Sequence, residues 1–154
     1  MRPPYVTLLI IRLGREMKIN VNEGTISFAA GIIEPNLDRT AFLKTPIGGA
    51  AKQMLVNAGY INYDISPEPD LTGSVVFKDD HLRKVFLLMR IPSDDSGQWT
   101  EELEQSRKAK HDEWLRAELG APPYEYPWGS VTSDFDPRGC ASDITVSYGD
   151  WRLA

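Results

Sequence analysis

The feature that most constrains the fold is a strand pattern at residues 82–91 that is apolar on both faces. Alternate residues of a strand point to opposite sides of a sheet, and one side here would carry Val85, Leu87, Met89 and Ile91. Phe86 and Leu88 would lie on the other side, which is typical of a central strand covered on both faces for part of its length. The polar residues 78–81 separate this run from an apolar run at 74–77, so the sequence predicts a β-hairpin.

Further strands are predicted near the start and in the middle of the chain. Residues 18–21 and 25–28 alternate between apolar and polar side chains on either side of the turn residues 22–24, which end in glycine. Residues 60–65 form another strand candidate, and the proline-containing segment 66–70 that follows is expected to be a loop.

The segment 126–149 has a polar, turn-rich composition and allows two interpretations. As a calcium loop beginning at Asp134 it fails, because Arg138 occupies the fifth position and the twelfth position lacks a carboxylate. As a hairpin it has an alternating strand at 144–148 and turn residues at 136–139, with the glycine expected in the left-handed corner. We favour the hairpin.

Two helices are predicted from their end signals. Thr100 is a good N-cap for a helix over 101–119, and Gly120 with the two prolines after it ends that helix. A second helix is expected over 46–58, with proline at its first position and Gly59 at its end. The fold class expected is therefore α+β, with an antiparallel sheet of about five to seven strands and these two helices packed against it.

The chain length fits a single α+β domain over residues 17–154. Residues 1–16 are interpreted as either an extra strand or a non-native extension, because Met17 opens the first well-patterned strand. The apolar run within this extension is too short to cross a bilayer, and no small-residue cleavage site follows it. No membrane association is expected.

The sequence contains little that points to catalysis. It has one cysteine, which excludes an intrachain disulfide and any site with several cysteine ligands, and it has two histidines. No phosphate-binding loop or nucleophile elbow is present, so no catalytic, cofactor-binding or metal-binding residues are predicted. A small enzyme using His111 or Cys140 remains one alternative, and a small-molecule binding module is another.

The charge and the aromatic residues favour a protein-binding function. A net charge of −5 argues against nucleic-acid binding and suits a basic partner, although an acidic surface also keeps a cytoplasmic protein soluble. Aromatic side chains among acidic and polar ones resemble interface anchors, but they could equally fill the edges of the sheet. The predicted partner-binding residues are Trp99, Glu101, Glu102, Tyr124, Tyr126 and Trp151.

The region from His111 to Tyr148, about a quarter of the chain, carries a series of short motifs. A helix ending in Trp-Leu and Leu-Gly is followed by Tyr-x-Trp-Gly-x-Val-x-Ser, Phe-Asp-Pro-Arg-Gly and Ser-x-Ile-x-Val-x-Tyr. These motifs resemble a group of small bacterial proteins, some encoded beside polymorphic toxins and presumed to be their immunity partners. The matching residues are Trp114, Leu115, Leu119, Gly120, Tyr126, Trp128, Gly129, Ser133, Asp136, Arg138, Gly139, Ile144 and Tyr148. The resemblance bears on the fold and implies no catalytic residue.

We therefore expect a non-enzymatic, cytoplasmic binding protein, most specifically an immunity protein that neutralises a cognate, basic protein toxin. An unpaired edge strand would also allow a homodimer, but the pattern does not identify that strand.

Overall fold

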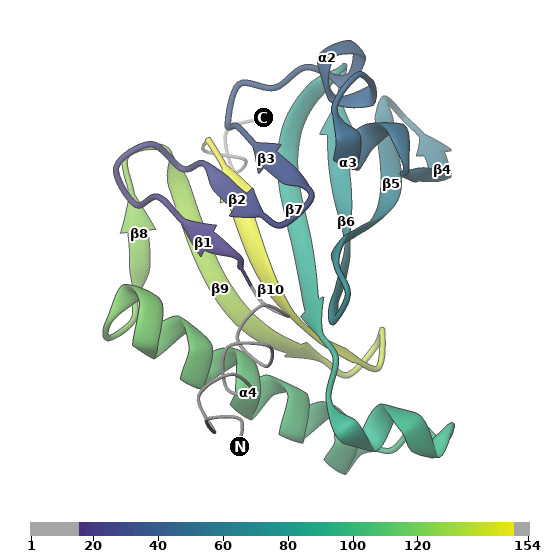
Figure 1. The fold of residues 1–154 in the computed structure, drawn as a ribbon, viewed down its shortest axis with the longest axis vertical. Coiled ribbons are helices and arrows are strands. Elements are labelled where there is room, and N and C mark those ends of the chain that lie inside the picture. The colour runs from purple at the N-terminus through teal and green to yellow at the C-terminus, as the bar shows by residue number, and fades with distance from the viewer. Residues whose placement is uncertain (1–15, 150–154) are drawn as a thin grey trace, which may run out of the picture.

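The computed structural model describes residues 16–149, and these form an α+β fold (Figure 1). The expectations for residues 1–15 and for Trp151 lie outside the described residues. A large antiparallel sheet contains, in spatial order, β4 (Lys52–Asn57), β5 (Tyr60–Glu68), β6 (Leu71–Lys78), β7 (His81–Met89), β10 (Ala141–Tyr148), β9 (Gly129–Asp136) and β8 (Tyr124–Tyr126). A small sheet contains β1 (Lys18–Ile19), β2 (Ile26–Phe28) and β3 (Gly31–Ile33). The helices are α2 (Arg39–Leu43), α3 (Pro46–Gly49), the 3₁₀ helix η1 (Pro92–Ser96) and α4 (Glu101–Leu119).

The predicted hairpin around residue 80 is confirmed, and its second strand is the central strand of the large sheet. β6 and β7 pair along their length, and Asp79 and Asp80 form the turn with φ values of 50° and 68°. Two consecutive positive φ values are typical of the tight turn that matches the twist of paired strands.

One face of the large sheet carries the core of the protein. The small sheet, α2, α3 and α4 lie over this face (Figure 1). Phe42 of α2 packs against Tyr63 and Phe77 of the sheet, with ring centroids 5.5 and 5.2 Å away. Among the elements within residues 16–149, none covers the opposite face, and Phe86 and Leu88 are only half-buried there. The expected cover on both faces of β7 is therefore wrong for the described part of the chain.

The expected helix over residues 46–58 is wrong beyond its first turn. α3 ends at Gly49, and β4 begins at Lys52. β4 forms a hairpin with β5 through Ala58 and Gly59, whose φ values are 51° and 84°. The paired glycines are poor helix formers, and the segment after them gains backbone hydrogen bonds by pairing with β5 on both sides of a bulge between Gln53 and Leu55.

The predicted helix over residues 101–119 is confirmed as α4. The Thr100 side chain accepts a hydrogen bond from the Leu103 N–H at 3.0 Å, and Gly120 follows the last turn with a φ of 85°. Its inward face buries Leu103, Arg107, His111 and Leu115. Glu104 in the acidic first half of the helix is also buried.

The hairpin predicted at residues 126–149 is confirmed as β9 and β10, which pair from Gly129–Tyr148 to Asp136–Ala141. Cys140, with a φ of 53°, takes the left-handed position of the turn that was expected for Gly139. β8 pairs with β9 only as far as Val131, so the outer edge of β9 has no strand partner beyond that residue in the described structure.

Candidate partner-binding surfaces

The two residues considered for catalysis lie in different surroundings. His111 is fully buried on α4, and its Nε2 accepts a hydrogen bond from the Met89 N–H at 3.0 Å. Cys140 is exposed in the β9–β10 turn, where its Sγ lies 3.6 Å from the Pro137 carbonyl oxygen. The hydrogen bond from Met89 holds α4 against the end of β7. It also occupies the lone pair that His111 would need to act as a general base.

A metal site and a membrane-spanning helix each place requirements on the residues that form them. Within residues 16–149, no group of three or more histidine, cysteine, aspartate or glutamate side chains is placed to hold a metal ion. None of the helices in that part of the chain has the length and apolar character needed to cross a membrane.

A buried ionic cluster fixes the first half of α4. The Arg107 side chain is 4% exposed and donates hydrogen bonds to Glu104 Oε1 at 3.0 Å, to the Met89 carbonyl at 2.6 Å and to both oxygens of Asp94. Glu104 in turn accepts a hydrogen bond from the Ser142 N–H at 2.9 Å. The Arg107 guanidinium holds the pKa of the Asp94 carboxyl below its usual value, although burial opposes this shift. These contacts are structural, because they join α4 to η1, β7 and β10.

The structure places the predicted partner-binding residues at two separate ends of α4. Trp99, which is 51% exposed, precedes the helix, and Glu101 and Glu102 are exposed in its first turn. Tyr124 and Tyr126 follow the other end, and a helix of 19 residues is about 28 Å long. These residues are therefore not brought together into one site.

The tyrosines after α4 are engaged within the protein. Tyr124 is buried, and its hydroxyl donates a hydrogen bond to the Gly120 carbonyl at 2.9 Å. Tyr126 is half-buried and stacks on Trp128, with ring centroids 5.1 Å apart. Trp128 Nε1 donates to the Val21 carbonyl at 2.8 Å, so this aromatic pair joins the large sheet to the small one. Both Trp114 and Trp128 are partly buried and pack against the core.

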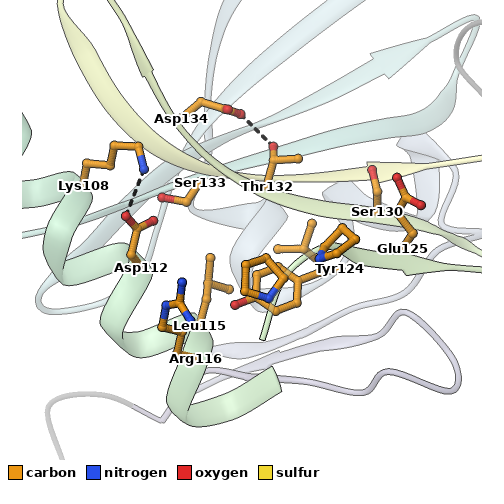
Figure 2. A pocket seen from close by; sticks show the side chains of 13 residues that line it. Lys108, Asp112, Leu115, Arg116, Tyr124, Glu125, Ser130, Thr132, Ser133 and Asp134 are labelled. Carbon is orange, nitrogen blue, oxygen red and sulfur yellow. Dashed lines mark hydrogen bonds and ion pairs between the residues drawn. The ribbon is translucent and has the colours of Figure 1, made fainter. Parts of the chain in front are cut away.

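A groove of about 450 Å³ with a mixed polar and apolar lining, including Tyr124, lies between α4 and the outer edge of β9 (Figure 2). It exists because β8 is short and leaves the edge of β9 open beyond Val131. On the helix side Lys108 Nζ lies 2.9 Å from Asp112 Oδ2. On the strand side Thr132 donates a hydrogen bond to Asp134 at 2.7 Å.

The charges in this groove are mixed. Burial alone would raise the pKa of the Asp112 carboxyl, but the Ser133 hydroxyl and the Lys108 ammonium outweigh burial and the pKa is lowered. Asp112 therefore stays ionised and paired at neutral pH, which suits a structural ion pair better than a proton-transfer group. The groove offers scattered hydrogen-bonding groups and opposite charges, without a convergent set of reactive side chains.

The edge strand β4 is a second candidate surface, and the sequence interpretation missed it. All six residues of β4 are exposed, and they include three consecutive apolar ones. Met54 is 53% exposed, and Leu55 and Val56 are each 58% exposed. The signal that would have revealed this strand is the Ala-Gly turn between two apolar runs, which is typical of a tight hairpin.

An open hollow of about 510 Å³ adjoins β4 on the uncovered face of the sheet. Its apolar surface comes from Leu55, Tyr60, Val76 and Phe86. Its charged residues are Lys78, Arg83 and Lys84, and no carboxylate of the described chain lines it. The Lys78 ammonium lies over the Tyr60 ring, 5.1 Å from its centroid. The hollow therefore combines apolar and aromatic surface with positive charge.

Comparison with known proteins identifies a likeness of fold. One chain of a solved structure described as "Rhs1-CT in complex with cognate immunity protein RhsI1" matches with a TM-score of 0.53 and 14% sequence identity. The match covers 86% of this chain and 87% of that chain. No protein-family model matches the chain, and no curated protein matches it significantly. The resemblance to immunity proteins of polymorphic toxin systems is thus supported at the level of the fold.

Proposed function

We propose that this protein is an immunity protein that binds a cognate toxin domain and blocks it without catalysis. The observation that carries the proposal is the fold likeness to a chain of a toxin–immunity complex, which extends over most of both chains. The motifs between His111 and Tyr148 resemble those of presumed immunity proteins, and this resemblance in sequence agrees with the likeness of fold.

The chemistry of the described residues supports binding over turnover. His111 is buried with its Nε2 engaged, and Cys140 lies exposed in a turn between two strands. The groove beside α4 holds paired charges, whereas β4 offers apolar surface of the kind that protein interfaces bury. The free Cys140 is also consistent with a reducing, cytoplasmic compartment.

The proposed partner is a cognate toxin domain, which we expect to be encoded beside this chain. The net charge of −5 favours a partner that is basic as a whole, since opposite net charges accelerate association.

Co-expression in a bacterial host tests the proposal. The neighbouring toxin domain should arrest growth alone, and this protein should restore growth and co-elute with the toxin as one complex. The control is a chain carrying Arg107→Met, which is destabilised. It should restore growth less than the wild-type protein does, in proportion to the decrease in the amount of folded protein. Failure of the folded wild-type protein to restore growth would refute the proposal. Growth arrest caused by this chain alone would also refute it, and would place the chain on the toxin side of such a pair.

A further inference from the structure

We propose that the free edge of β4 is the docking strand for an extended, acidic segment of the partner. The segment adds to the large sheet as an eighth strand, with apolar side chains beside Val56 on the core face and carboxylates on the uncovered face, where Leu55 and the neighbouring cations line the hollow. Assigning this segment to the toxin domain rests on the proposed function, whereas the preference of the edge for an acidic strand does not.

The outer edge of β4 is unpaired in the described part of the chain. β4 pairs with β5 on one side, and no strand lies beyond it within residues 16–149 (Figure 1). Natural proteins protect such edges with prolines, inward-pointing charges or covering elements, because unpaired backbone groups attract other strands. β4 has no proline, and its only charge is Lys52 at its first position. Its bulge lies between Gln53 and Leu55, so the regular part of the open edge is residues 55–57.

β4 is exposed on both of its faces. Leu55 is paired with Asn62 and belongs to the uncovered face of the sheet, whereas Val56 is paired with Ile61 and belongs to the core face. Both side chains are 58% exposed, so the helices that cover the core face do not reach this strand. A strand added to β4 would bury apolar surface on both sides while its backbone completes the ladder, which is the arrangement of strand-addition complexes.

The opposite edge of the sheet shows what a protected edge looks like in this protein. β8 has three residues, and Pro127 follows it at once. Tyr124 on β8 is buried, and the open part of β9 beyond it carries polar residues next to α4. The contrast indicates that β4 is left open selectively.

Charge complementarity defines the partner segment. The cations Lys78, Arg83 and Lys84 line the hollow beside β4, although the protein as a whole is acidic. Three carboxylates lie nearby without lining the hollow: Asp64 is paired across from Lys52, Asp79 donates its backbone N–H to the Gly59 carbonyl, and Asp143 interacts electrostatically with Lys84. The charged side chains that line the hollow itself are all cations. A segment with carboxylates over the hollow is therefore attracted, and a basic segment is repelled.

The first test measures binding of the neighbouring toxin domain by calorimetry. Leu55→Glu and Val56→Glu should each weaken binding on the order of 30-fold, the factor that corresponds to losing a central interface anchor. Ile32→Glu is the matched control, because Ile32 is 52% exposed but belongs to the small sheet, and it should leave binding unchanged. Lys78→Glu should weaken binding and reduce its dependence on salt. If wild-type protein binds and both β4 variants bind equally well, the docking proposal is overturned while the proposed function stands.

The second test does not depend on the toxin. A short peptide alternating valine with glutamate should shift the NMR signals of β4 in the wild-type protein, and a peptide alternating valine with lysine should bind at least about tenfold more weakly. The Leu55→Glu variant should lose this response, because its carboxylate repels the glutamates of the peptide, and its circular dichroism spectrum should confirm that it is folded. Equal binding of both peptides, or no binding of either, would overturn the proposal whatever the calorimetry with the toxin domain shows. Concentration-dependent dimerisation that Leu55→Glu abolishes would assign the edge to a second copy of the chain, and would also overturn it.

Discussion

Replacing Arg107 by methionine is expected to destabilise the protein strongly, because it removes the cation from a buried ionic cluster. Methionine keeps most of the side-chain volume, so the change isolates charge and hydrogen bonding from packing. In the variant, Glu104, whose side chain is 6% exposed, loses its paired cation. Asp94, whose side chain is 25% exposed, loses its two hydrogen bonds to the guanidinium.

The expected loss in the free energy of unfolding follows from the burial of these side chains. Removing one partner of a buried ion pair costs about 3–5 kcal/mol, because the remaining charge is left uncompensated. Glu104 keeps the hydrogen bond from the Ser142 N–H, and Asp94 retains some access to water, so we expect the lower end of this range, about 3 kcal/mol. That loss is a large part of the 5–15 kcal/mol by which a typical domain is stable.

Equilibrium unfolding in urea at neutral pH measures this loss, and Arg90→Met is the matched control. Arg90 pairs with Asp95 in solvent, where the two side chains are 44% and 68% exposed. An exposed ion pair of this kind contributes about 0.5 kcal/mol. Equal free energies of unfolding for the two variants, both within about 1 kcal/mol of the wild-type value, would refute the reasoning.

The pH dependence gives a second readout of the same cluster. Asp94 has a lowered pKa in the folded protein, so it stabilises the fold above its ordinary value of 3.8 and loses this effect as pH falls through the folded pKa. The difference in free energy of unfolding between wild type and Arg107→Met should therefore shrink as the pH is lowered below about 4. A difference that stays constant over this range would contradict the assigned role of Asp94.

Three further changes test other parts of the fold. Gly129→Ala should destabilise the β9–β10 hairpin by about 2 kcal/mol or more, because φ at this position is 153° and a Cβ would lie 1.9 Å from the Ser147 carbonyl oxygen; an unchanged melting temperature would contradict this. Asp143→Asn should raise the free energy of unfolding at pH 7, since burial raises the pKa of this carboxyl, and the gain should vanish at acidic pH where aspartate is protonated. Trp128→Phe removes the hydrogen bond to the Val21 carbonyl, so amides of the small sheet should exchange faster and stability should fall by about 1 kcal/mol; unaltered exchange would show that this bond does not hold the small sheet.

Several elements could be predicted because their signals are local. The helix over Glu101–Leu119 has a capping threonine before it and a glycine after it, and both act on neighbouring backbone groups. The β6–β7 and β9–β10 hairpins combine alternating side chains with turn residues between them. The local signals did not specify which turn residue takes the left-handed conformation, and this position belongs to Cys140.

The candidate surfaces were harder to predict than the elements. Trp99 is exposed as the sequence indicated, but Tyr124 is buried and lies at the other end of α4. The sequence shows that a residue is aromatic and close to a loop, but the packing of distant strands determines whether its ring reaches solvent. For the same reason the apolar edge at Met54, Leu55 and Val56 was interpreted as part of a helix face.

The sequence by itself determined that the chain forms an α+β fold rich in antiparallel hairpins, because alternation, caps and turns act between near neighbours. Only the tertiary structure decided that the segment after α3 is a strand, since the cap at Thr45 starts a helix but pairing with β5 ends it. Tertiary structure also decided that Arg107 and His111 face inward, because their partners Asp94 and Met89 come from other elements. The exposed edge of β4 is a property of the whole sheet, since a strand becomes an edge only through the order in which all the strands are placed.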